Sequence, residues 1–187
     1  MIWIAFFSQT GSEIVELSKS IKRKPDLLVT NNFEDKIKFH PGIRELGVTI
    51  MSAKHDMIMN YFRNQVVYNV PQTLISLHGY LRILPADICE KYEVYNGHPA
   101  PIHLYPELKG KDKQEDLYKY KDRYERIGCI IHRVTPDLDE GDVIVSIDEI
   151  NTLTSLEDSY LKAKPLSLKS WEIFFNDHLP NKMFNRQ

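Results

Sequence analysis

The sequence predicts an α/β protein with a doubly wound, mostly parallel sheet of the Rossmann type and helices on both faces. Short runs of large apolar side chains alternate along the chain with amphipathic segments. The apolar runs are typical of strands buried on both faces, and turn residues separate them from the helical segments. The 187 residues are 42% hydrophobic, which suits one ordinary domain rather than two large ones.

The first half of the chain is expected to form strand–helix units. Residues 2–8 are apolar and indicate a buried strand, and residues 13–22 carry apolar side chains at helical spacing after a break at residues 9–12. The remaining elements expected here are strands at residues 27–30, 47–51 and 73–77, a helix at 54–63, and a loop or poor helix at 32–46.

The second half is expected to complete the sheet and add an antiparallel edge. The expected elements are a helix at residues 85–90, a strand at 92–95, a surface loop at 100–111, a helix within 112–124, strands at 127–134 and 142–150, a helix opening at the capping box of residues 154–157, and a last helix at 166–178. We therefore expect a main domain over residues 1–150 and a helical extension over residues 151–187, packed on the same domain.

Composition excludes several classes of function. The 26 acidic and 24 basic residues give a net charge of −2, which argues against a nucleic-acid partner bound mainly through charge. Apolar stretches fall far short of the roughly 20 residues of a membrane span, and the N-terminus lacks a secretory leader pattern. Cys89 and Cys129 are too few for a disulfide framework or a four-cysteine zinc site. The expectation is a reduced, cytoplasmic protein with neither nucleic-acid nor membrane partners and no metal.

Three polar segments follow expected strands and are predicted to meet at one edge of the sheet. They are residues 9–12, 79–84 and 96–99. Open α/β sheets bind ligands in the crevice outside the carboxyl ends of their strands. These segments therefore indicate where a ligand would lie.

The segment at residues 9–12 has two interpretations. Gly11 and Ser12 stand at a strand-to-helix turn, where backbone N–H groups and a hydroxyl can hold an anion, but a plain helix cap is the somewhat favoured alternative. Glu13 in the first helical turn would repel a nearby phosphate. Two other histidines are weaker candidates for a functional site. His55 with Asp56 is expected to be a surface pair, and a substrate contact is the less favoured interpretation of His103.

The segment Asn96-Gly97-His98-Pro99 suggests chemistry. An asparagine amide can donate to a developing oxyanion, and a histidine two residues later can hold or transfer a proton. Downstream, Asp139 lies in a turn that could bring its carboxylate to the same crevice. From the residue types alone, a coincidental grouping is the slightly favoured interpretation.

Four sequence segments, in one order along the chain, make a coincidental grouping the less favoured interpretation. Residues 79–84, 96–99, 105–112 and 128–134, with Asp139 and Gly141 after them, resemble the signature segments of folate-dependent formyltransferases related to glycinamide ribonucleotide transformylase. The resemblance runs from residue 2 to about residue 150. Asn-x-His-Pro is weak evidence by itself, whereas four elements in the right order are strong evidence.

The resemblance implies transfer of a formyl group from 10-formyltetrahydrofolate to a primary amine of a small, nucleotide-like substrate, without a metal. It implies that Asn96 and protonated His98 stabilise the oxyanion, and that Asp139, linked to His98, takes the proton leaving the amine. His132 would brace the loop that bears Asp139. The residues implied to bind folate are Arg82, Ile83, Leu84, Thr135 and Leu138, and those implied to bind a substrate anion are Gly11 and Ser12.

Departures from the pattern indicate an altered acceptor. The first turn of this family grips a phosphate and usually reads Ser-Gly-x-Gly-Ser/Thr-Asn, but here Gln9 replaces a glycine and Glu13 replaces the asparagine. We therefore expect weak or no activity on glycinamide ribonucleotide. The alternatives are a catalytically idle module that binds folate or a nucleotide, and an unrelated nucleotide-binding α/β module.

Overall fold

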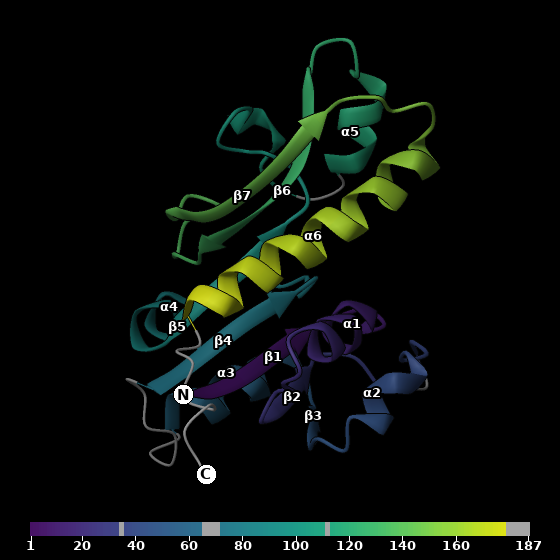
Figure 1. Cartoon of the computed structure of the whole chain (residues 1–187). Helices are drawn as coiled ribbons and strands as arrows, with labels where there is room; N and C mark the ends of the chain where they lie inside the picture. The colour runs from purple at the N-terminus through teal and green to yellow at the C-terminus, as the bar shows by residue number, and fades with distance from the viewer. Residues whose placement is uncertain (34–35, 65–71, 111–112, 179–187) are drawn as a thin grey trace.

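A computed structural model describes residues 1–33, 36–64, 72–110 and 113–178. Its centre is a seven-stranded sheet in the order β3-β2-β1-β4-β5-β6-β7, seen as the band of arrows in Figure 1. The strands are β1 (Ile2–Phe7), β2 (Leu27–Thr30), β3 (Ile50–Ser52), β4 (Thr73–His78), β5 (Glu93–His98), β6 (Arg126–Arg133) and β7 (Val143–Ile150). Strands β1 to β5 pair in parallel, while β6 and β7 are antiparallel to their neighbours. The expected mostly parallel sheet with an antiparallel edge is confirmed.

Helices cover both faces of the sheet. They are α1 (Ser12–Ser20), α2 (Pro41–Glu45), α3 (His55–Asn64), α4 (Ala86–Lys91), α5 (Lys113–Lys119) and α6 (Leu156–His178), with a 3₁₀ turn at Pro106–Leu108. No helix in these described ranges has the length and apolar character needed to cross a membrane.

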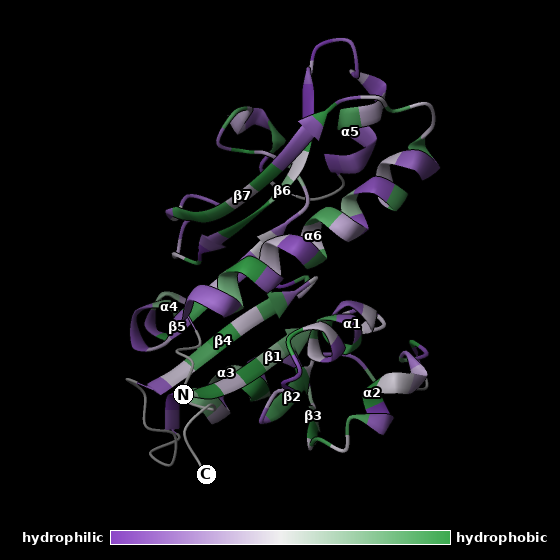
Figure 2. Ribbon diagram, in the orientation of Figure 1, coloured by the Kyte–Doolittle hydropathy of each residue, from purple (hydrophilic) through white to green (hydrophobic). Residues whose placement is uncertain are grey.

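The side chains of β1 show how each face acquires its own core. Trp3, Ala5 and Phe7 pack with residues of α1 and α6, whereas Ile4 and Phe6 pack with residues of α3 and α4. This division follows from the two-residue period of a strand, which points alternate side chains to opposite faces. In Figure 2 the ribbon of β1 is green along most of its length, as expected of a strand buried on both sides.

The expectation of two separate helices near the C-terminus is wrong. Residues 156–178 form one helix that contains Pro165 and lies across the sheet in Figure 1. A proline lacks the N–H needed for the helical hydrogen bond, so it normally ends or bends a helix. Here the second half continues because it buries Trp171, Phe174 and Phe175, all fully inaccessible to solvent, against the sheet. Packing of this apolar face offsets the cost of the proline.

The strand expected at residues 92–95 is longer in the structure and includes Asn96 and His98. Parallel pairing with β4 reaches only Asn96, but antiparallel pairing with β6 continues through His98, opposite Ile130. Pairing with β6 therefore extends β5 beyond the end of its pairing with β4. Because strand side chains alternate, Asn96 and His98 point to the same face of β5.

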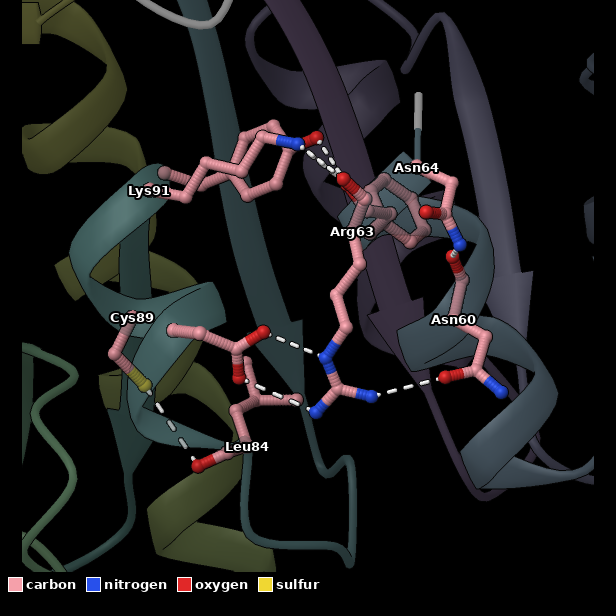
Figure 3. Close-up of polar contacts among 9 residues, drawn as sticks. Asn60, Arg63, Asn64, Leu84, Cys89 and Lys91 are labelled. Atoms are coloured by element: carbon pink, nitrogen blue, oxygen red, sulfur yellow. Dashed lines mark hydrogen bonds and ion pairs between the residues drawn. The ribbon is translucent and has the colours of Figure 1, made fainter. Parts of the chain in front are cut away.

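Side-chain hydrogen bonds join α3 to α4, close to the loop that leads into α4. Arg63 donates two N–H groups to the Asp87 carboxylate, at 2.6 and 3.2 Å. Figure 3 shows the Arg63 side chain and its dashed contacts. The Lys91 ammonium donates to the carbonyl of Arg63 at 2.9 Å, at the C-terminus of α3 where unpaired carbonyls accumulate. The Cys89 thiol contacts the carbonyl of Leu84 at 3.8 Å. These contacts join α3 to α4, and the last of them joins α4 to Leu84.

Candidate active site

A cleft of about 860 Å³ lies beyond the carboxyl ends of β1, β4 and β5. All the residues singled out from the sequence as site candidates line it: Gly11, Ser12, Arg82, Ile83, Leu84, Asn96, His98, His132, Thr135, Leu138 and Asp139. His55 also lines it, whereas His103 lies elsewhere and bonds to Ser146. The three segments expected at one sheet edge therefore meet around one cavity.

Four side chains converge at one part of the cleft. The Asn96 amide lies 3.1 Å from Nε2 of His132, its neighbour across the β5–β6 pair. Asp139 places Oδ2 3.4 Å from Nδ1 of His98 and Oδ1 3.4 Å from Nε2 of His132. His98, His132 and Asp139 are almost fully buried, so their interactions are weakly screened by water.

A hydrogen-bond partner determines the tautomer of the neutral His98 imidazole. His98 Nε2 lies 2.9 Å from the carbonyl oxygen of Leu108, which can only accept, so Nε2 carries the proton and Nδ1 keeps its lone pair. His132 Nδ1 lies 3.0 Å from the carbonyl of Arg133 and donates to it. Its Nε2 lies 3.1 Å from the Asn96 amide and 3.4 Å from Asp139 Oδ1, so His132 contacts both groups.

Burial lowers the pKa of His98, and the nearby Asp139 carboxylate opposes this effect only in part. Burial alone would raise the pKa of Asp139, but His132, His98 and the backbone N–H of Gly110 together lower it below its ordinary value. The resting arrangement is thus a neutral imidazole with an open lone pair beside an ionised carboxylate. A proton arriving at His98 Nδ1 would be stabilised by that carboxylate.

The turn that carries Asp139 is built for this placement. Asp139 has φ +54°, in the left-handed region that Asp and Asn tolerate better than most residues, and its Oδ2 accepts from Gly110 N at 2.9 Å. A Cβ atom on Gly141 would lie 1.8 Å from the carbonyl oxygen of Arg133, so only glycine fits where the turn closes on β6. The Asp-x-Gly spacing therefore reflects both the special backbone at Asp139 and the crowding at Gly141.

Gly97 also has a steric role. A Cβ atom there would lie 2.8 Å from Nε1 of Trp171, which packs against β5 from α6. The indole thus fills the space beside the residue between Asn96 and His98. The glycine lets α6 pack closely behind the strand that carries both side chains.

A second part of the cleft wall is formed by residues 79–84. Gly79 turns the chain with φ +64° at the end of β4, and the backbone N–H of Leu81 donates to the Ser8 hydroxyl at 2.9 Å. Ile83 and Leu138, from two separate segments that line the cleft, leave 64% and 54% of their surface exposed. These exposed apolar side chains make this part of the cleft, here called the slot, suited to a flat, partly apolar ring.

The α1 end of the cleft differs from a simple anion-binding turn. Gly11 adopts the left-handed conformation before α1, as a tight turn requires, and Ser12 begins the helix. Glu13 also lines the cleft, and its Oε2 lies 2.7 Å from Nδ1 of His78, while the Ser167 hydroxyl donates to Oε1. Burial alone would raise the pKa of Glu13, but the contacts with His78, Ser167 and the Trp171 indole lower it below the ordinary value.

Sequence reasoning did not identify His78 or Ser167 as cleft residues. His78 is separated from Glu13 by 65 residues and Ser167 by 154, and neither belongs to a local motif. The one available signal was the position of His78 directly before the Gly79 turn. Within the described ranges, no cluster of three metal-ligating side chains is present.

Solved structures place this fold among known proteins, although the sequence matches no family model and no curated protein. A phosphoribosylglycinamide formyltransferase from Coxiella burnetii is 17% identical, with a TM-score of 0.76 over 93% of this chain and 84% of that one. The enzyme of that name from Campylobacter jejuni is 18% identical, with a TM-score of 0.75 over 94% and 96%. A sugar N-formyltransferase from a Shewanella species is 17% identical, with a TM-score of 0.65 over 96% and 68%. Over nearly its whole length, the chain has the fold of the phosphoribosylglycinamide formyltransferases.

Proposed function

We propose that the protein transfers a formyl group from 10-formyltetrahydrofolate to a primary amine of a small substrate. The convergence of Asn96, His98 and Asp139 at one end of an open cleft carries this proposal. Amide formation requires a donor for an oxyanion, a group that accepts a proton and a group that stabilises the resulting charge. These three side chains supply one group for each task.

In the proposed reaction, the amine nitrogen attacks the formyl carbon, and the carbonyl oxygen becomes an oxyanion that accepts a hydrogen bond from the Asn96 amide. His98 Nδ1 takes the proton that leaves the amine, because this nitrogen is unprotonated and the lowered pKa of Asp139 makes its carboxylate a weaker base. Asp139 stabilises the imidazolium, which then returns the proton to the departing folate nitrogen. The proposal differs from the roles implied by the resemblance, in which protonated His98 stabilises the oxyanion and Asp139 takes the proton. Here His98 takes the proton, with Asp139 as its partner.

The folate would lie in the slot between residues 82–84 and the turn at residues 135–139. Ile83 and Leu138 offer exposed apolar surface there, Leu84 packs behind them in the core, and backbone groups of both segments can bond to the polar edge of a pterin. His132 acts by positioning: its Nε2 contacts both the Asn96 amide and the Asp139 carboxylate, so it holds the two groups beside each other. The neighbouring solved structures named as formyltransferases support this assignment.

The proposal is tested by incubating the purified protein with 10-formyltetrahydrofolate and a panel of primary amines, and measuring the products by mass spectrometry. We expect an amine that gains one formyl group, together with release of tetrahydrofolate. Calorimetry with a non-hydrolysable folate analogue tests the donor site separately. Folate binding without transfer to any amine would favour the catalytically idle module, and absence of binding to the folded protein would refute the folate assignment.

A further inference from the structure

The α1 end of the cleft carries a carboxylate that the proposed transfer reaction does not use. Glu13 comes from the first turn of α1, and 27% of its side chain is exposed, whereas the His78 side chain behind it is 1% exposed. Nε2 of His78 lies 2.9 Å from the Ser76 hydroxyl. The Trp3 indole N–H donates to the oxygen of that hydroxyl at 2.7 Å. A chain of buried hydrogen bonds therefore anchors the imidazole that holds Glu13 in place.

The carboxylate of Glu13 has accepting capacity to spare. An ionised carboxylate offers about four lone-pair positions, of which His78 and Ser167 use two and the Trp171 indole can use a third. Because Glu13 is partly exposed and lines the cleft, the last position can accept a hydrogen bond from a molecule bound there. The lowered pKa of Glu13 keeps it ionised at neutral pH.

The two lysines that line this cleft are already paired with other carboxylates. The Lys164 ammonium lies 2.8 Å from Glu16, and that of Lys113 lies 3.0 Å from Asp116. A phosphate placed beside Glu13 would therefore meet a negative charge without an unpaired lysine to offset it. A hydroxyl or ammonium group at that place would instead find an acceptor.

We propose that Glu13, positioned by His78 and Ser167, selects the acceptor of this enzyme. The α1 end of the cleft takes an amine that presents hydroxyl or ammonium groups there, and it excludes an amine that presents a phosphate. This inference rests on the proposed formyl transfer and adds the class of acceptor to it. It agrees with the expectation, from the sequence, of low activity on glycinamide ribonucleotide.

The test uses two matched pairs of amines that differ only by a phosphate: ethanolamine with O-phosphoethanolamine, and glucosamine with glucosamine 6-phosphate. Binding to the protein saturated with a folate analogue is measured by calorimetry, and formyl transfer by mass spectrometry. We expect the wild-type protein to prefer at least one unphosphorylated amine over its phosphate by about tenfold or more. Glu13→Gln should shift that ratio by about tenfold toward the phosphorylated amine, the size expected for removing one like-charge contact near the surface.

Glutamine preserves the size of residue 13 and can bond to both partners, so Glu13→Gln tests charge alone. The matched control is Glu172→Gln, which removes a charge from α6 at a residue that does not line the cleft, and should leave the ratio unchanged. Preference of the wild-type protein for phosphorylated amines, binding of neither member of either pair, or an unchanged ratio in Glu13→Gln would each overturn the inference. If Glu13→Gln does not fold, the preference of the wild-type protein between the two members of each pair decides whether the inference stands. Binding of the folate analogue is scored separately, so its failure counts against the proposed function itself.

Discussion

Replacement of Asp139 by asparagine tests the proposed chemistry most directly. Asparagine has nearly the same shape, tolerates the left-handed backbone at φ +54°, and can still accept from the N–H of Gly110. The substitution therefore removes the negative charge 3.4 Å from His98 Nδ1 and leaves the turn in place. A large effect on rate would then report electrostatics rather than unfolding.

The expected magnitude follows from the geometry. Two unit charges about 4 Å apart interact by about 4 kcal/mol at an effective dielectric constant of 20. Loss of that stabilisation when His98 becomes charged corresponds to about three orders of magnitude in rate. This agrees with the roughly 10²–10⁴-fold contribution of general acid–base groups. We expect kcat to fall by this amount, with the affinity for a folate analogue changed by only a few-fold.

The pH profile gives a second readout for the same variant. Activity requires neutral His98, so the wild-type rate should rise as pH increases through the pKa of this histidine. Asp139 raises that pKa, in opposition to burial, and Asp139→Asn should therefore move the acidic limb to lower pH. Asp142→Asn is the matched control, because Asp142 belongs to the same loop but does not line the cleft. Turnover near the wild-type value in Asp139→Asn would refute the proposed mechanism.

Four further substitutions address other parts of the site. Asn96→Ala should lower kcat by about 10²–10³-fold in the transfer assay, as for loss of one oxyanion donor. Gly97→Ala should lower the free energy of unfolding by about 1–3 kcal/mol in denaturant titrations, because its Cβ would lie 2.8 Å from Trp171 Nε1. Ile83→Asp should weaken folate-analogue binding about tenfold or more in calorimetry, since it removes apolar surface from the slot. Glu13→Gln should reduce the loss of thermal stability on acidification below pH 4.5, the ordinary pKa of this carboxyl, because a carboxyl with a lowered folded-state pKa contributes stability that disappears as pH falls through that pKa.

Each of these expectations has a result that would contradict it. Normal turnover in Asn96→Ala would show that the Asn96 amide does not stabilise the oxyanion. Unchanged stability in Gly97→Ala would show that the indole behind β5 can shift freely. Wild-type affinity in Ile83→Asp would place the folate elsewhere, provided that its melting temperature stays the same, as expected for an exposed side chain. Equal acid sensitivity of wild type and Glu13→Gln would mean that Glu13 has the same pKa in the folded and unfolded states.

Much of the fold was predictable because its signals are local. Apolar runs such as residues 2–8, and helical spacing such as that of residues 13–22, correspond to β1 and α1 with shifts of one or two residues at their ends. The antiparallel edge was also expected, from turn residues between the strand-like segments. Element type depends on periodicity over a few residues, and the sequence contains that information directly.

The site was only partly predictable, and the resemblance to formyltransferases was needed to link Asn96 and His98 with Asp139. Residue types indicated oxyanion and proton chemistry, but neither spacing nor composition could show that Asp139 lies 3.4 Å from both His98 and His132. That proximity depends on the register between β5 and β6 and on the turn that closes at Gly141.

The sequence by itself therefore determined the α/β class, the strand-end segments and the residue types available for chemistry, since each depends on neighbours along the chain. The tertiary structure decided what depends on distant partners. Pairing with β6 extends β5 through His98, and burial of Trp171 against the sheet carries α6 past Pro165. Contacts across 65 and 154 residues turn Glu13 from a helix-capping charge into an anchored carboxylate of the cleft. Such contacts form only when separate elements pack together, and no local pattern encodes which residues will then meet.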